Sequence, residues 1–206
     1  MTEFLIECPD DARWIYLFAH GAGAGMRQEF MEKAAAALAR EKVATVRWEF
    51  PYMAARRSRP DRADVAEDAV RHAWDRLRDH SLPALPMFAG GKSFGGRMTS
   101  RAAAWTLGGL PDLAGIAFMG FPLYGAGKPP STERADHLAR VNVPLLFVQG
   151  SRDELADLAT LRPVVEKLGP RATLHVIEGA DHGFSNRNAY AEIATTIAAW
   201  MARVTR

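Results

Sequence analysis

The chain has 206 residues, of which 48% are hydrophobic and 24% are charged, and its formal net charge is +2. These are ordinary values for a globular protein and they exclude intrinsic disorder. The small net charge gives no indication of nucleic acid as a partner. The length fits a single α/β domain over residues 1–206, with too few residues left for a second domain or a large lid.

The N-terminal residues 1–7 place acidic side chains around a short apolar run. They lack the basic start and the long apolar stretch of a signal peptide. The longest weakly charged stretch, residues 107–127, is interrupted by Pro111, Pro122 and several glycines, which a membrane-spanning helix would not contain at this density. We therefore expect a cytoplasmic protein that has no membrane as a partner.

Short apolar runs alternate with longer amphipathic stretches along the whole chain. The apolar runs predict strands at residues 14–19, 43–48, 86–89, 113–119, 144–148 and 172–177. The amphipathic stretches predict helices at residues 26–40, 63–80, 94–107, 132–140, 155–168 and 189–203. The longest loops are expected at residues 50–60 and 121–130, which are rich in proline, glycine or arginine.

Several of the predicted strands are apolar at successive positions, as in residues 144–148. Such runs are typical of parallel strands that helices cover on both faces. The sequence therefore predicts an α/β fold, a three-layer sandwich with a mostly parallel central sheet and helices on both faces.

Residues 91–95 read Gly-Lys-Ser-Phe-Gly and lie between a predicted strand and a predicted helix. A Gly-x-Ser-x-Gly sequence in this setting is typical of a nucleophile elbow, a tight turn in which glycines relieve backbone clashes. Ser93 is therefore the candidate nucleophile, and an incidental serine in a glycine-rich turn is the structural alternative. A phosphate-binding loop would require glycine at position 86, where this chain has Pro86.

A serine nucleophile needs a base within hydrogen-bonding reach and a carboxylate that orients the base. His182 follows the last predicted strand, and Asp153 follows the strand before it. The chain order Ser93, Asp153, His182 is the order that hydrolases of this architecture use. The sequence therefore predicts that these three residues form a catalytic triad.

Each partner of the nucleophile has rivals. Glu154 and Asp157 are alternatives to Asp153, whereas Asp181 is next to His182 in the chain and is too strained there to orient it. Four other histidines are candidates for the base. We expect solvated helix positions for His72, His80 and His137, and a position within a strand for His175.

Acyl transfer also requires donors that stabilise the developing oxyanion. The amide of Phe94 follows the nucleophile and is the first candidate. Residues 20–25 read His-Gly-Ala-Gly-Ala-Gly directly after a predicted strand, so their backbone amides can turn toward the site. We predict the Ala22 amide as the second donor, with the Gly23 amide as its nearest competitor.

Taken together, residues 20–23, 91–97, 150–153 and 181–184 resemble the motifs of the α/β-hydrolase superfamily. More narrowly, they resemble its compact dienelactone-hydrolase-like branch, which includes the testis-expressed protein thirty group. The resemblance extends across nearly the whole chain. It implies the triad Ser93, Asp153 and His182 and a minimal α/β-hydrolase fold without a cap domain.

The motifs predict an esterase or thioesterase that acts through an acyl-enzyme on a small ester-like molecule, with no metal or organic cofactor. The bulky charged residue Lys92, next to the nucleophile, leaves a non-catalytic binding or scaffold protein as the alternative. The single cysteine, Cys8, excludes an intramolecular disulfide and a cysteine-rich metal site, and its apolar surroundings predict a buried structural thiol.

A cluster of basic residues lies in the loop at residues 50–60, where Arg56, Arg57 and Arg59 follow a predicted strand. This cluster has two interpretations: it lines the entrance to the site and attracts an acidic substrate, or it belongs to a solvated surface loop. Lys128 in the second long loop has the same two interpretations. The sequence contains no indication of the oligomeric state.

Overall fold

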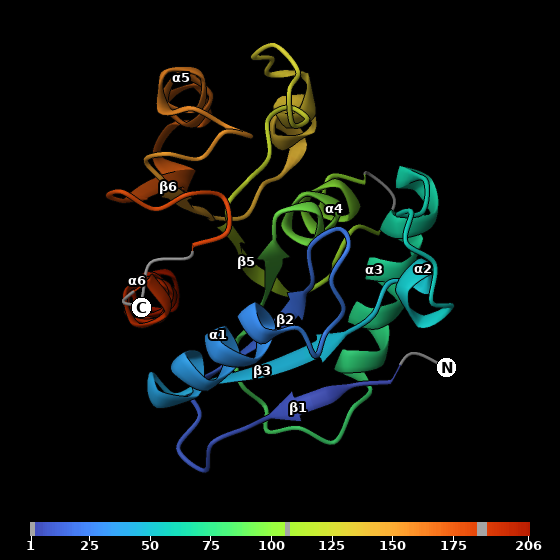
Figure 1. Ribbon diagram of the computed structural model, residues 1–206. Coiled ribbons are helices and arrows are strands. Elements are labelled where there is room, and N and C mark those ends of the chain that lie inside the picture. Colours follow the sequence, from blue (N-terminus) through green and yellow to red (C-terminus); the bar gives the residue numbers. More distant parts are fainter. Residues whose placement is uncertain (1–2, 106–107, 185–188) are drawn as a thin grey trace.

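The computed structural model describes residues 3–105, 108–184 and 189–206 (Figure 1). Its centre is a seven-stranded sheet in the order β1-β3-β2-β4-β5-β6-β7. All neighbouring strands are parallel except β1, which pairs with β3 in the antiparallel direction. The strands are β1 (Leu5–Glu7), β2 (Trp14–Ala19), β3 (Val43–Trp48), β4 (Met87–Lys92), β5 (Leu113–Met119), β6 (Leu145–Gly150) and β7 (Ala172–Ile177).

Helices cover both faces of this sheet. The α-helices are α1 (Glu29–Arg40), α2 (Pro51–Ala54), α3 (Ala63–Arg78), α4 (Phe94–Ala103), α5 (Leu158–Leu168) and α6 (Ala189–Val204), and the 3-10 helices are η1 (Glu133–Arg140) and η2 (Gly169–Arg171). The helices α1 and α6 pack together on one face, whereas α3, α4, η1 and α5 cover the other (Figure 1). The predicted fold class is confirmed, and no cap domain is present among the described residues.

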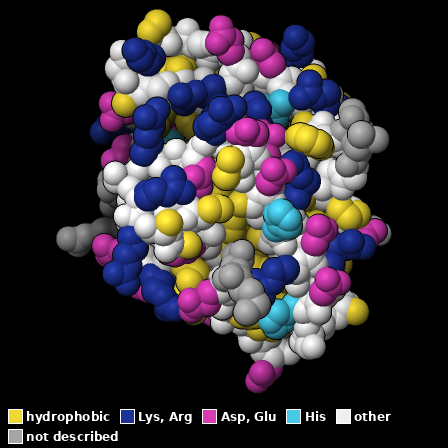
Figure 2. All heavy atoms as spheres, turned by 90° about the vertical axis from the view of Figure 1, so that its right-hand side faces the viewer, with side chains coloured by type: hydrophobic (Ala, Val, Ile, Leu, Met, Phe, Trp, Pro, Cys, Tyr) yellow, Lys and Arg dark blue, Asp and Glu magenta, His cyan; other side chains and the backbone are white. Residues whose placement is uncertain are grey.

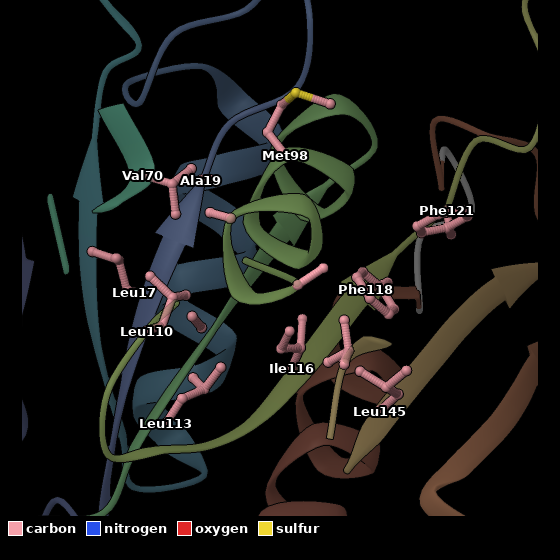
Figure 3. Packing of buried hydrophobic residues seen from close by; sticks show 14 of the residues in the cluster. Leu17, Ala19, Val70, Met98, Leu110, Leu113, Ile116, Phe118, Phe121 and Leu145 are labelled. Carbon is pink, nitrogen blue, oxygen red and sulfur yellow. The ribbon is translucent and has the colours of Figure 1, made fainter. Parts of the chain in front are cut away.

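The continuous apolar runs of the central strands have a direct structural cause. In β2, Leu17 and Ala19 face the cluster beneath α3 and α4, whereas the alternate residues Tyr16 and Phe18 face the cluster beneath α1 and α6. Successive side chains of a strand point to opposite faces, so both sets of positions must be apolar. Figure 3 shows the first cluster, in which Leu17 and Ala19 lie near Val70 of α3.

Capping side chains set the starts of two helices that the sequence placed too early. The helix α1 begins at Glu29 because Gln28 caps it and accepts a hydrogen bond from the Phe30 amide at 2.8 Å. The helix α5 begins at Leu158 because Asp157 accepts a hydrogen bond from the Thr160 amide at 2.8 Å. Such caps satisfy amides that have no acceptor within the helix.

Other differences concern short elements and one helix end. The short strand β1 was not predicted, and the loop expected at residues 50–60 contains the one-turn helix α2. The helix α4 ends at Ala103, and its predicted end at residue 107 lies outside the described residues. The segment at residues 132–140 is helical, but it has the 3-10 geometry of η1.

The prediction that Cys8 is buried is wrong, because this residue is exposed just beyond the end of the edge strand β1. An edge strand has a neighbour on one side only, so an apolar run there need not be buried. None of the helices in the described part of the chain combines the length and the apolar character needed to cross a membrane.

Close backbone packing beneath α4 leads to a prediction about stability. A Cβ atom at Gly95 would lie 2.6 Å from the Ala19 carbonyl oxygen, closer than a real contact allows. We expect Gly95→Ala to lower the free energy of unfolding by about 2 to 3 kcal/mol, because α4 must move away from β2. Chemical denaturation monitored by circular dichroism measures this change.

The control is Gly125→Ala, because a Cβ at Gly125 would meet its nearest neighbour at an ordinary 3.4 Å. A loss of stability in Gly125→Ala as large as that in Gly95→Ala would contradict the steric explanation.

Candidate active site

Ser93 occupies a strained turn at the carboxyl end of β4. Its backbone has φ 49° and ψ −115°, a conformation that is rare for a residue with a side chain. The Ser93 amide donates a hydrogen bond to the Met119 carbonyl at 3.0 Å, and the Ser93 carbonyl accepts one from the Arg97 amide at 3.1 Å. The turn therefore has the strand-to-helix geometry of a nucleophile elbow.

His182 lies in the loop after β7 and joins Ser93 to Asp153. Its Nε2 is 2.8 Å from Ser93 Oγ, and its Nδ1 is 2.8 Å from Asp153 Oδ2. The Asp153 side chain is fully buried, whereas that of His182 is 20% exposed. When Nδ1–H donates to the carboxylate, Nε2 is left free to accept the serine proton.

The Asp153 carboxylate is held by two further donors. Its Oδ1 accepts a hydrogen bond from the Leu155 amide at 2.8 Å, and its Oδ2 accepts one from Gln149 Nε2 at 2.6 Å. Gln149 is fully buried in β6, and its Oε1 accepts a hydrogen bond from the Phe121 amide at 2.9 Å. Buried carboxylates need such partners, and these bonds fix the position of the Asp153 carboxylate against the imidazole.

Gln149 was not predicted from the sequence. The signal was present, because Gln149 is the one polar side chain in the strand Leu145–Gly150. Polar side chains inside a strand that is covered on both faces need a buried partner. The partner is the carboxylate of Asp153, four residues later in the chain. The sequence alone does not specify this contact, because it depends on how the chain turns after β6.

The structure places the carboxylates that were alternatives to Asp153 at other positions. Glu154 is exposed, and Asp181 is exposed as well. Asp157 caps α5 and accepts a hydrogen bond from the Tyr124 hydroxyl at 2.6 Å, and this bond is the main reason that its pKa lies below the usual range. Of these carboxylates, Asp153 is the one that the structure places against the imidazole of His182.

Among the other histidines, His72 and His80 are exposed as expected, and His175 of β7 bonds to Glu192 at 2.8 Å. The expectation of a solvated His137 is wrong, because this residue is 5% exposed and its Nε2 lies 2.8 Å from Ser100 Oγ. Burial, followed by the charges of nearby arginines, lowers the pKa of His137 to about 3.

The glycine-rich loop after β2 is held from beneath by His20. This side chain is fully buried, and its Nε2 accepts a hydrogen bond from the Phe50 amide at 3.1 Å. Its Nδ1 donates to the Gly21 carbonyl at 2.8 Å. Burial lowers the pKa of His20, and this shift favours the neutral ring that both bonds require.

The two predicted oxyanion donors belong to different elements. The Phe94 amide belongs to the first residue of α4 and has no acceptor within the helix. Ala22 is exposed and lines the same cavity as Ser93. The Gly23 amide instead contacts the Tyr52 hydroxyl, where it partly offsets the rise in the Tyr52 pKa that burial causes. Of the two loop residues, Ala22 is the one that belongs to the described lining of this cavity.

Lys92 lies in the lining of the cavity at Ser93, and its ammonium supports the loop that carries His182. Its ammonium donates a hydrogen bond to the His182 carbonyl and lies 5.0 Å from the centroid of the Phe184 ring. A Cβ atom at Gly120 would lie 3.1 Å from Lys92 Nζ and 3.3 Å from His182 Nδ1, so both groups border one small space. Burial lowers the Lys92 pKa to about 8, although the charges of Asp153 and Asp181 oppose this shift.

A cavity of about 320 Å³ adjoins Ser93 and His182. Its described lining is mixed apolar and polar and includes Ala22, Phe30, Met31, Lys92 and Leu155. The lining does not include Arg56, Arg57 or Arg59, which are exposed. Arg57 pairs with Asp61 at 2.7 Å. These positions favour the interpretation of that cluster as a surface loop.

The chain matches the family model described as "Alpha/beta hydrolase domain" over residues 12–205. This match confirms the resemblance to the α/β-hydrolase superfamily that the motifs indicated.

Solved structures with the same fold share little sequence with the chain. A dienelactone hydrolase from Anabaena variabilis has 21% identity and a TM-score of 0.79, and the alignment covers 98% of this chain and 91% of that one. An esterase domain of a Rhodothermus marinus protein has 16% identity and a TM-score of 0.74, with 98% of each chain covered. An alpha-beta serine hydrolase homologue from Coxiella burnetii has 21% identity and a TM-score of 0.71, with 98% and 90% covered. At these identities the similarity is one of fold.

The lowered pKa of Lys92 predicts a pH-dependent contribution to stability. Below its folded-state pKa of about 8, Lys92 is charged in both states and the folded protein bears the cost of burying the charge. Between pH 8 and the ordinary pKa of 10.5 the folded state releases this proton first, so stability rises with pH. From about pH 7 to about pH 10, we expect the free energy of unfolding of the wild type to rise by about 2 kcal/mol relative to Lys92→Met.

Urea denaturation at a series of pH values measures this difference. In the control variant, Lys167→Met, the replaced lysine is exposed on α5, and its difference from the wild type should stay constant over the same range. A constant difference for Lys92→Met as well would show that Lys92 keeps an ordinary pKa.

Proposed function

The chain belongs to the α/β-hydrolase domain family, and on that premise we propose that it is a serine hydrolase of the esterase or thioesterase type. In this proposal Ser93 is the nucleophile, His182 the general base and acid, and Asp153 the residue that orients the imidazole. The observation that carries the proposal is the unbroken chain of hydrogen bonds from Ser93 Oγ through His182 to Asp153, with both distances at 2.8 Å beside a cavity.

In the first half of the reaction, Ser93 Oγ attacks the carbonyl carbon while His182 Nε2 takes up the serine proton. The negative charge that develops on the carbonyl oxygen is stabilised by the amides of Ala22 and Phe94, each worth about 3 to 4 kcal/mol in comparable enzymes. When the tetrahedral intermediate collapses, the bond to the leaving group breaks and His182 returns the proton to the departing alcohol or thiol.

In the second half, a water molecule takes the place of the leaving group. His182 removes a proton from this water as the oxygen attacks the acyl-enzyme, and the same two amides stabilise the second oxyanion. The carboxylic acid leaves, and the proton on His182 returns to Ser93 Oγ. Asp153, held by Gln149 and the Leu155 amide, keeps the imidazole in one tautomer and orientation throughout.

Two observations support a small ester-like substrate. The cavity beside Ser93 has a volume of about 320 Å³, at the lower end of the range for small-molecule sites. Proteins with this fold include a dienelactone hydrolase, an esterase domain and a monoacylglycerol lipase. An ester or thioester bond with a small acyl group is the substrate class that we propose from these facts.

The proposal predicts covalent labelling of Ser93 by a fluorophosphonate probe. We expect the wild type to be labelled, Ser93→Ala to give no labelling, and His182→Ala to react about 10² to 10⁴ times more slowly, because the serine loses its general base. In-gel fluorescence and mass spectrometry of the labelled peptide measure the outcome.

The matched control is Ser100→Ala, which removes a serine from another serine–histidine pair with the same 2.8 Å distance. Labelling should be unchanged in this variant. A folded wild-type protein that does not react would refute the hydrolase proposal and support a non-catalytic binding or scaffold protein.

The proposal also predicts a measurable role for Gln149. Gln149→Met preserves the side-chain volume but removes the donor to Asp153 and the acceptor for the Phe121 amide. We expect kcat to fall about tenfold, which corresponds to about 1.4 kcal/mol in barrier height, with KM little changed. Steady-state hydrolysis of 4-nitrophenyl acetate measures both constants. A rise in KM with unchanged kcat would show that Gln149 does not act through the orientation of Asp153.

A further inference from the structure

A group of basic side chains lies between α4 and η1, close to the elbow but apart from the cavity at Ser93. Both helices follow parallel strands and lead to the next strand, so they run in the same direction away from the carboxyl edge of the sheet. The hydrogen bond between Ser100 and His137 joins the two helices at 2.8 Å. Arg97 and Arg134 each lie three residues before this bond, and the charge of Arg134 is close enough to lower the Arg97 pKa, so the two side chains lie near one another.

Arg97 is half-buried, and no hydrogen bond or ion pair to its guanidinium is found among the described residues. Burial is the main cause that lowers its pKa to about 10, and the charges of Arg134 and Arg101 lower it further. A half-buried cation beside two others is unfavourable unless an anion is near. Glu67, the carboxylate among the described residues whose charge acts on Arg97, is already bonded to Arg101 and to Trp105 Nε1.

Arg134 is held in place by the loop that follows β5. Its Nη1 donates a hydrogen bond to the Tyr124 carbonyl at 2.8 Å, which leaves its other nitrogens available. A Cβ atom at Gly125 would lie 3.4 Å from Lys128 Cγ and 3.6 Å from Arg134 Nη2, so these two side chains converge above Gly125. Lys128 is exposed.

The remaining carboxylates of η1 do not neutralise this group within the described part of the chain. Glu133 is exposed and forms no ion pair with it. Asp136 lines a different groove, between η1 and α5, together with Lys167 and Arg171. On the face that carries α2 and α3, Lys and Arg side chains gather in a band across the upper part of the view (Figure 2).

We propose that Arg97, Arg134 and Lys128 form a binding site for a phosphate group. Guanidinium groups bind phosphate oxygens through pairs of parallel hydrogen bonds, and an ammonium adds a mobile point charge. Of these three cations and the neighbouring Arg101, Arg101 is the one that forms an ion pair with a carboxylate, that of Glu67, within the described part of the chain, so a phosphate dianion would compensate the remaining positive charge.

The site is distinct from the proposed hydrolase centre. None of its three residues belongs to the described lining of the cavity at Ser93. It is nevertheless close, because the Arg97 amide donates to the Ser93 carbonyl and lies one helical turn along α4. The proposal therefore goes beyond the proposed function and does not depend on the reactivity of Ser93.

Isothermal titration calorimetry with inorganic phosphate, against chloride at matched ionic strength, tests the site. We expect saturable binding to the wild type and to Ser93→Ala, and about tenfold weaker binding to Arg97→Gln and Arg134→Gln. Arg97→Lys keeps the charge without the planar fork and should bind with intermediate affinity. The control is Arg162→Gln, an exposed position on α5, which should bind as the wild type does.

Thermal unfolding in chloride shows whether each variant is folded before titration. Binding that does not saturate, or that is equal in the wild type, Arg97→Gln and Arg134→Gln, overturns the proposal. A second titration, with glycerol 3-phosphate, identifies the source of the group: tighter binding than that of inorganic phosphate indicates a phosphomonoester, and equal binding indicates free phosphate. Because Ser93→Ala is included, a failure of the labelling experiment and a failure of this site are distinguishable.

Discussion

The arrangement of the site depends on backbone segments that approach one another too closely for any side chain. At the elbow, a Cβ on Gly91 would lie 2.9 Å from the carbonyl carbon of Ala19, and one on Gly95 would lie 2.6 Å from the Ala19 oxygen. At the end of β6, a Cβ on Gly150 would lie 2.8 Å from the carbonyl carbon of Ala180. These glycines bring β4 against the end of β2, and β6 against the loop that carries His182. The spacing of Ser93, His182 and Asp153 follows from these contacts.

Close packing also excludes water from the Asp153 carboxylate, and hydrogen bonds from the protein replace those that water would donate. The Asp153 carboxylate is fully buried and accepts bonds from His182, Gln149 and the Leu155 amide. A buried carboxylate without such donors would be costly and would tend to become protonated. Lys92 adds a cation on the same side, and the charge of Asp153 opposes the fall in the Lys92 pKa that burial causes. The Asp153 carboxylate is thus surrounded by polar groups from β4, β6 and two loops.

A feature could be predicted from the sequence when the residues that determine it are neighbours in the chain. The bounds of β2, β3, β5 and β7 match the predicted ranges. In β2 and β5, which helices cover on both faces, apolar residues occupy successive positions and make the strands readable. The elbow and the order of Ser93, Asp153 and His182 are also readable, since each residue directly follows a strand and parallel strands end at one edge. The three-residue strand β1 was missed because it is only half-buried. The roles of Gln149 and Lys92 and the burial of His137 depend on partners from other elements, which no local pattern specifies.

Two serine–histidine pairs in the same molecule show why distance alone does not define a hydrolase centre. Ser93 with His182 and Ser100 with His137 both have a separation of 2.8 Å, and both serines lie within or directly before α4. His182 has a carboxylate on its other nitrogen and adjoins a cavity, which is the arrangement that the proposed general base requires. His137 instead faces the charges of Arg101 and Arg97, which oppose protonation, and Ser100 is fully buried. A general base must carry a proton during the reaction, and only the surroundings of His182 favour that step.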